Sequence, residues 1–202
     1  MKKILWVTIM TFLILTPAFS VSSGLEFNAL YHSIDRTVHY DNPNYTTQHI
    51  KGSELDLRLS VKTLIGYSYG LSFYGGGLKP LSLKVDGSSV DLSGSGWSWY
   101  FGANNIFLFD LDYFSQLELT IGYDSAFQTV GHAEARLDTA RASLKYNLLD
   151  WEGYFFSFGL EYSYPIFGRI IDYQDSDYST QFLSTGKGSI ALLVGIGLQT
   201  LW

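Results

Sequence analysis

Charged side chains occur at alternate positions in several segments of the chain. Between residues 54 and 62, Glu54, Asp56, Arg58 and Lys62 are separated mostly by aliphatic residues. Carboxylates and cations on one face can pair with one another, and they can also line a path along which ion pairs exchange partners. Burial without a partner would be costly, so pairing is the minimum that such an array requires.

Three of the four histidines, His32, His39 and His49, lie close together in the sequence, and His132 stands apart. A metal site requires ligands that converge at fixed distances, and closeness in sequence does not ensure this. We interpret these histidines as solvent-exposed loop residues. The sequence therefore predicts neither a metal site nor a cofactor site.

Hydroxyl and carboxyl groups near the histidines supply the residue types of an acyl-transfer site. Ser33, Asp35 and Ser53 accompany His32 and His39. A general base must lie within hydrogen-bond reach of its nucleophile, and no spacing here imposes that contact. The chain has no cysteine, which excludes a cysteine nucleophile, a thiolate zinc site and disulfides. No catalytic residue is predicted.

The segments that carry these residues alternate with period two, which is typical of β-strands and not of helices. Eight strands are predicted, at residues 25–37, 53–63, 67–77, 95–109, 115–127, 137–148, 154–165 and 187–202. Short connections near 64–66, 110–114 and 149–153 alternate with long, polar ones near 38–52, 78–94, 128–136 and 166–186. Antiparallel neighbours joined in this way form an up-and-down sheet.

Two local features modify this pattern. Asn105 falls on the apolar face of the fourth strand, which predicts a β-bulge at Asn104–Asn105. A turn at the same place would change the strand count. In the connection 78–94, Asp86-Gly87 separates two short apolar segments, which predicts a hairpin that projects beyond the main sheet.

Composition restricts the class of protein. Aromatic residues make up 17% of the 202 residues, and charged residues make up 16%, against roughly 25% charged in soluble proteins. Disorder is excluded, because disordered chains are poor in aromatic residues and rich in charge. Thirteen Lys and Arg against 19 Asp and Glu give a formal net charge of −6, which argues against a nucleic-acid partner. The length suits one domain.

The N-terminus has the order of features found in secretory signal peptides. Lys2 and Lys3 precede an apolar run, and the small residues Ala18 and Ser20 follow it. The run of about twelve residues is too short to span a bilayer. We predict a cleaved signal peptide at residues 1–20, with cleavage after Ser22 or Ser23 as a variant, and a domain at residues 21–202. A retained N-terminal anchor helix is the alternative.

Alternation alone leaves open which face of the sheet meets water. A soluble barrel places aliphatic side chains inside, whereas a transmembrane barrel places them against lipid around a polar lumen. Bulky aromatic residues on one face, small polar residues on the other and aromatic residues near strand ends favour the transmembrane case. A spanning sheet must also close without free edges. The predicted fold is all-β: a closed antiparallel transmembrane barrel with long extracellular loops and short periplasmic turns.

The last strand carries the most specific pattern, because residues 188–202 alternate strictly and end in the aromatic Trp202. With the pattern of the whole chain after residue 20, it resembles the small eight-stranded outer-membrane barrels of the OmpA/OmpX/OmpW type, whose last residue is usually Phe. The resemblance implies an outer-membrane location, contact with outer-membrane lipid and lipopolysaccharide, and Trp202 as a signal for the outer-membrane assembly machinery.

Both signs of charge are predicted to face the lumen. These residues are Glu26, Glu54, Asp56, Arg58, Lys62, Glu118, Asp124, Arg141, Lys145, Glu161 and Lys187. The same residue types suit a network that fills the barrel and a narrow, gated ion path, so composition leaves both open.

Tyrosine and aspartate accumulate in the predicted outer loops. The residues are Tyr40, Asp41, Tyr45, Asp172, Tyr173, Asp175, Asp177 and Tyr178. Such loops suit recognition of a surface ligand, and they equally suit a plain hydrophilic cover.

The sequence therefore favours a non-enzymatic outer-membrane barrel with interaction loops. A conduit for small or apolar solutes of the OmpW kind is the first alternative, although Leu193 and Phe155 are predicted to point into the lumen and disfavour an open pore. A lipid A-modifying barrel enzyme and a soluble periplasmic ligand-binding barrel are the others.

Overall fold

A computed structural model describes residues 22–40, 46–65, 68–93, 95–130, 133–172 and 179–201. The predicted signal peptide, His132 and Trp202 lie outside these residues. The tyrosines and aspartates predicted for the outer loops also lie outside them, except Tyr40 and Asp172, of which only the backbone is described. Within the described part, no helix is long and apolar enough to cross a membrane.

The described chain consists of antiparallel strands in one sheet. They are β1 (Ser22–Tyr40), β2 (Gln48–Leu64), β3 (Tyr69–Val85), β4 (Ser88–Ser89), β5 (Ser98–Asp112), β6 (Ser115–Val130), β7 (Ala133–Leu149), β8 (Tyr154–Asp172) and β9 (Ser179–Leu201). Each long strand pairs with its neighbours in sequence, and β1 pairs with β9, which closes an eight-stranded barrel. The two-residue β4 only extends the end of β3.

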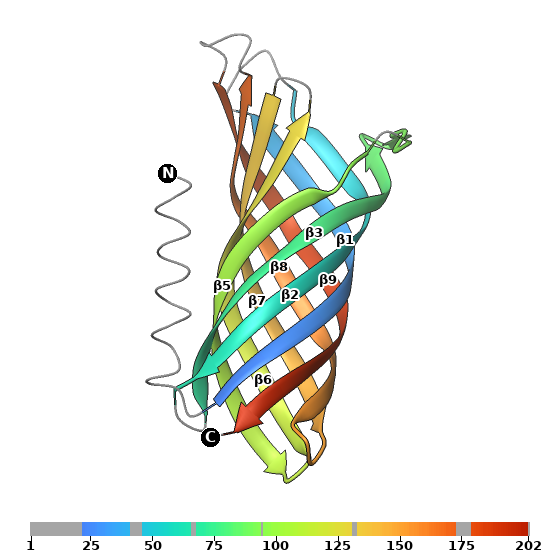
Figure 1. Cartoon of the computed structure of the whole chain (residues 1–202). Coiled ribbons are helices and arrows are strands. Elements are labelled where there is room, and N and C mark those ends of the chain that lie inside the picture. Colours follow the sequence, from blue (N-terminus) through green and yellow to red (C-terminus); the bar gives the residue numbers. More distant parts are fainter. Residues whose placement is uncertain are drawn as a thin grey trace.

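The two ends of the barrel differ. At one end, called the turn end, short connections join β2 to β3, β5 to β6 and β7 to β8, and β1 begins and β9 ends there (Figure 1). The other end, called the loop end, carries the remaining connections. Several strands run further toward the loop end than the sequence predicts, for example β8 to Asp172 in place of residue 165.

The predicted hairpin around Asp86-Gly87 is confirmed. Asp86 has φ +50° and Gly87 has φ +85°, as a two-residue hairpin turn with positive φ at both positions requires. The β3–β4 hairpin leans away from the barrel at the loop end (Figure 1).

The predicted bulge at Asn104–Asn105 is wrong. Pairing of β5 with β3 and with β6 continues through both residues without a register shift. Asn105 keeps its place on the outer face, where its Oδ1 accepts a hydrogen bond of 2.8 Å from the Tyr69 hydroxyl. Because this bond gives the amide oxygen a partner, no extra residue is needed to turn Asn105 away from the apolar face.

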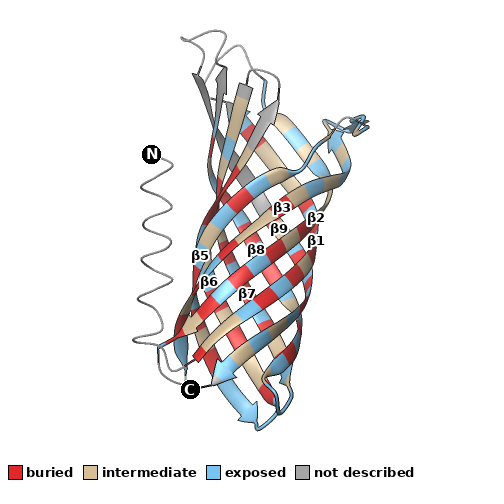
Figure 2. Ribbon diagram, in the orientation of Figure 1, coloured by how far each residue is buried: buried red, intermediate tan, exposed pale blue. Residues whose placement is uncertain are grey.

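Side-chain burial shows that the barrel is apolar outside and polar inside. Ile121 and Phe158 are 51% and 46% exposed, whereas Asp56, Glu118 and Glu161 are at most 2% exposed. Exposed and buried residues alternate along each strand through the middle of the barrel (Figure 2). A soluble ligand-binding barrel would require the opposite polarity, so that alternative is contradicted.

The height of the apolar band matches a membrane. On β8, the exposed Tyr154 and Tyr164 bracket the exposed Phe156, Phe158 and Leu160. Ten residues span about 33 Å along a strand, which is about 25 Å along the membrane normal at the usual tilt of transmembrane barrels. Aromatic residues at both edges of such a band are typical of membrane interfaces.

Candidate lumen network and outer rim

Near the turn end, two lysines and two glutamates form a closed set inside the barrel, called here the Glu–Lys ring. Glu26 on β1, Lys62 on β2, Glu118 on β6 and Lys145 on β7 supply its side chains. Each ammonium contacts both carboxylates: Lys62 lies 2.8 Å from Glu26 and 2.6 Å from Glu118, and Lys145 lies 2.8 Å and 2.7 Å from the same two. The ring is electrically neutral, as burial of four charges requires.

A second set, called the arginine cluster, lies further toward the loop end. The Arg58 guanidinium contacts Glu161 at 2.6 Å and Asp56 at 2.9 Å. Arg141 contacts Glu161 at 2.6 Å and pairs closely with Asp124. Two arginines thus meet three carboxylates, all almost completely buried. Strands β2, β6, β7 and β8 are joined across the lumen by these contacts.

Two tyrosines complete the arginine cluster. The Tyr100 hydroxyl donates to Asp56 and accepts a hydrogen bond of 2.9 Å from Arg58 Nε, and the Tyr74 hydroxyl donates to Asp124 at 3.2 Å. A Cβ at Gly76 would lie 2.7 Å from the Tyr100 hydroxyl. Glycine at this position leaves the space in which the ring lies against the barrel wall. The phenol donors stabilise the excess carboxylate charge of the cluster.

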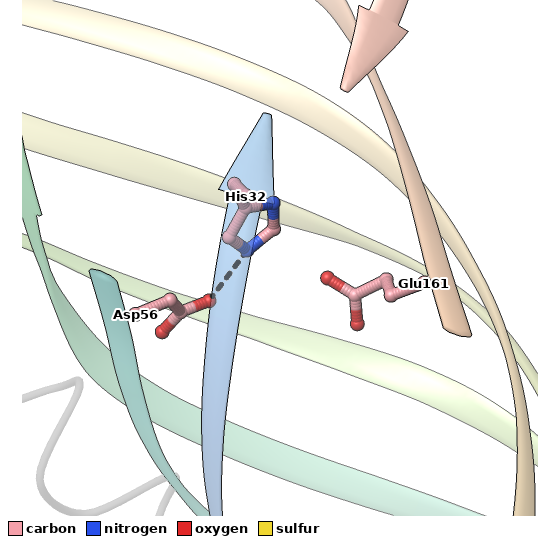
Figure 3. Close-up of side chains that lie close together, drawn as sticks. All are labelled: His32, Asp56 and Glu161. Carbon is pink, nitrogen blue, oxygen red and sulfur yellow. Dashed lines mark hydrogen bonds and ion pairs between the residues drawn. The ribbon is translucent and has the colours of Figure 1, made fainter. Parts of the chain in front are cut away.

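His32 is buried beside this cluster, which corrects its prediction as a solvent-exposed loop residue. Its Nε2 lies 3.4 Å from Asp56 Oδ2, and Glu161 is close by (Figure 3). These three side chains could offer converging metal ligands, since their ligand atoms lie within 4.8 Å of one another. However, Arg58 and Arg141 already bind both carboxylates. A divalent cation would face two guanidiniums at close range, so the charges favour an ion-pair network over a metal centre.

Apolar side chains fill the lumen around the charged sets. Leu64, Ile106 and Leu108 pack together, and Leu30 packs against Leu193. Phe155 is also buried, with Lys62 Nζ 5.1 Å from its ring centre. All of these are at most 6% exposed. The interior is therefore a packed core of ion pairs and apolar groups in the part of the barrel that the structure describes.

The structure brings nine of the predicted lumen charges together in the ring and the cluster. Glu54 is only partly buried and interacts electrostatically with Arg36 on β1, apart from both sets. The side chain of Lys187 lies outside the described residues. Sequence reasoning missed His32, Tyr74 and Tyr100, although all three share the inward phase of their strands.

The candidate catalytic residues do not assemble as the sequence allowed. His32 points inward while the adjacent Ser33 is exposed on the outer face. At the loop end, His49 Nδ1 lies 3.2 Å from the Thr37 hydroxyl and its Nε2 lies 3.3 Å from Asp35. Ser53 hydrogen-bonds Ser82 at 2.9 Å. The exposed chain Thr37–His49–Asp35 has the order of a hydroxyl, a base and an acid.

Exposed charge is distributed unevenly between the two ends. Among described side chains, the exposed cations all lie in the loop-end half: Lys51, Lys79, Lys84, Arg136 and Arg169. The turn end exposes the carboxylates Asp110, Asp112, Asp150 and Glu152 and, in the described residues, no cation. The Phe114 N–H donates to Asp112 at 2.8 Å and holds the pKa of that carboxyl below its ordinary value. The turn end therefore stays negative.

Comparison with known proteins bears on this fold. No family model and no curated protein matches the chain. Among solved structures, OprG from Pseudomonas aeruginosa is similar with a TM-score of 0.54 and 10% identity, over 91% of this chain and 98% of OprG. Neisserial surface protein A has a TM-score of 0.53 and 11% identity, over 87% and 96%. AlkL, an outer-membrane protein, has a TM-score of 0.53 and 11% identity, over 91% and 92%. The chain has the fold of the small eight-stranded outer-membrane barrels.

Proposed function

We propose that the protein is an integral outer-membrane barrel without catalytic activity, whose filled lumen stabilises the barrel and whose loop end carries its interactions. The apolar outer band supports membrane insertion, and the loop-end cations support interactions on that side. The last strand, followed by Trp202, would serve as the signal for the outer-membrane assembly machinery. The outer loops would recognise surface ligands.

The packed lumen is the observation that carries this proposal. An ion that crosses the barrel would have to pass both the Glu–Lys ring and the arginine cluster. Each passage would separate buried ion pairs that lie at 2.6–2.9 Å, and leaving a buried charge without its partner costs about 3–5 kcal/mol. A filled barrel fits these contacts better than a conduit for ions or small solutes.

We expect the purified protein to form no steady, resolvable channels in planar lipid bilayers, because the two charged layers block the lumen in series. Single-channel recording measures this directly. Heat-modifiable gel mobility of the same preparation serves as the control, since a folded barrel migrates differently before and after boiling. Steady channels from a heat-modifiable preparation would contradict the filled-lumen proposal and favour a conduit.

A lipid-modifying enzyme is the second candidate, and the Thr37–His49–Asp35 chain is the observation that favours it. Its hydroxyl and base are within hydrogen-bond reach, as nucleophilic catalysis requires. Against it, Thr37 lies within β1, which pairs with β2 and β9 at this residue. The backbone N–H groups of β1 around Thr37 therefore take part in the sheet, and they do not form the oxyanion-stabilising site that acyl transfer needs.

Mass spectrometry of lipid A from cells with and without the protein tests the enzyme candidate. We expect identical acyl chains in both. A change in acylation that disappears on His49→Ala and persists on His39→Ala would establish the enzyme and overturn the non-enzymatic proposal. His39 is the matched control because it also hydrogen-bonds a threonine hydroxyl, Thr47, at 3.0 Å.

A further inference from the structure

Two lysines face each other directly on the outer face of the loop end. Lys51 on β2 and Lys84 on β3 are Cα partners in the antiparallel ladder, and both are exposed. Side chains directly opposite in such a ladder lie about 5 Å apart at Cβ, and like charges at this spacing are destabilising. An anion bound between them would remove this repulsion.

A third lysine extends the pair toward the apolar band. Lys79 pairs with Leu55, below a register shift near Ser53, and its ammonium lies 5.9 Å from the centre of the Trp97 ring. Lys51, Lys79 and Lys84 are called here the lysine patch. The Lys51 ammonium lies 3.7 Å from Asp35, and the side chain of Asp86 accepts a hydrogen bond from the backbone N–H of His49 at the hairpin turn. The three lysines outnumber these two carboxylates, and Asp91, the other exposed carboxylate of the hairpin, accepts hydrogen bonds from the backbone N–H and the hydroxyl of Ser93.

The position of the patch indicates what kind of anion it meets. Exposed Leu59 and Val61 lie below it on β2, and Trp99, 66% exposed, lies on the neighbouring β5. Tryptophan at such a border is typical of the level of lipid headgroups. The hairpin that carries Lys84 leans away from the barrel (Figure 1). In a membrane that surrounds the apolar band, this hairpin would lie over the lipid surface. A charged group here is thus in reach of lipid phosphates, and phosphates accept hydrogen bonds from several ammonium groups at once.

The turn end provides the contrast within the same molecule. Its exposed charges are carboxylates, with no described exposed cation. This difference in exposed charge between the two ends fits a membrane whose leaflet at the loop end carries lipid phosphates, because lysines there would neutralise the phosphate charge. Clusters of lysines at a membrane surface bind anionic lipid headgroups by the same attraction.

We propose that the lysine patch is a binding site for a phosphorylated lipid of the outer leaflet, with Trp97 and Trp99 beside its headgroup. This inference rests on the proposed membrane function. It assigns particular residues to contact with the lipid surface, and it separates this contact from recognition by the loops.

The test titrates the protein, folded in dodecyl maltoside, with bisphosphorylated lipid A and with the same lipid after removal of its phosphates, followed by tryptophan emission. We expect the phosphorylated lipid to bind at least about tenfold more tightly, since each lysine contributes about fivefold. The variant Lys51→Gln/Lys79→Gln/Lys84→Gln should lose this preference. The matched variant with arginine at the same three positions should keep it.

Three results would overturn the proposal: equal affinity for the two lipids, an unchanged preference in the glutamine variant, or displacement of the lipid by millimolar inorganic phosphate. Lysine-dependent binding of heparin without lipid A binding would assign the patch to a polysaccharide and also overturn it. Heat-modifiable mobility of every variant shows whether the barrel is folded. The titration is made in detergent, so it does not depend on insertion of the protein into a bilayer. A protein that fails to insert into membranes would contradict the proposed function, and the lipid titration would still show whether the lysine patch binds phosphorylated lipid.

Discussion

Arg58→Met will lower the free energy of unfolding by about 3–5 kcal/mol, the range found when one partner of a buried ion pair is removed. The side chain is 4% exposed and donates hydrogen bonds to Glu161, Asp56 and Tyr100. Methionine fills much of the same volume but leaves both carboxylates with one arginine fewer. Urea unfolding in lipid vesicles, followed by tryptophan emission, measures the loss.

Arg136→Met is the matched control. Arg136 also pairs with an aspartate, Asp138 at 2.9 Å, but its side chain is 47% exposed. Exposed pairs contribute about 0–1 kcal/mol. The double variant Arg58→Met/Glu161→Gln should lose less stability than the sum of the single changes, because the neutral amide no longer needs the guanidinium. Equal losses at Arg58 and Arg136 would show that the arginine cluster does not hold the barrel together.

Leu160→Arg will destabilise the folded barrel by about 2–4 kcal/mol in lipid, the cost of a cation at the middle of a membrane-spanning strand. Leu160 is 55% exposed and its partners on either side, Leu144 and Leu192, are exposed as well. If this face met water, arginine would be tolerated with little change. The same unfolding measurement in vesicles separates the two cases.

Leu148→Arg is the control for membrane depth. Leu148 is also an outward, exposed leucine, but it lies one residue before the end of β7 at the turn end. Near the membrane interface the cost falls to about 0–1 kcal/mol. Similar effects at the two positions would show that the outer face has no apolar middle and would contradict the membrane assignment.

The faces of the strands could be predicted from the sequence because alternation has a period of two. Once the phase of residues 55–62 is known, Asp56, Arg58 and Lys62 must share one side of the sheet. The inside-out polarity followed from the aromatic borders and the small polar residues of the other face. The strand ends were predicted less well, as at β8, because above the membrane the outer face meets water and the apolar alternation stops.

The error at His32 has another cause. It was grouped with His39 and His49 because the three lie close together in the sequence, although the predicted strand 25–37 contains it. Its phase, shared with Glu26, was the signal that places it in the lumen. The bulge predicted at Asn105 failed for a different reason: a single polar residue on the outer face is tolerated when a neighbour, here Tyr69, supplies its hydrogen bond.

The sequence by itself determined the strand phase, the closed antiparallel sheet and nine of the charges that face inward, since these depend only on local alternation and on the need to pair every backbone group in lipid. Only the tertiary structure decided which charges meet. Lys62 contacts Glu118, 56 residues away along the chain, because strand tilt and closure bring β2 and β6 to the same height inside the barrel. Those contacts make the lumen a core, and the register of β2 on β3 places Lys51 opposite Lys84 on the outside.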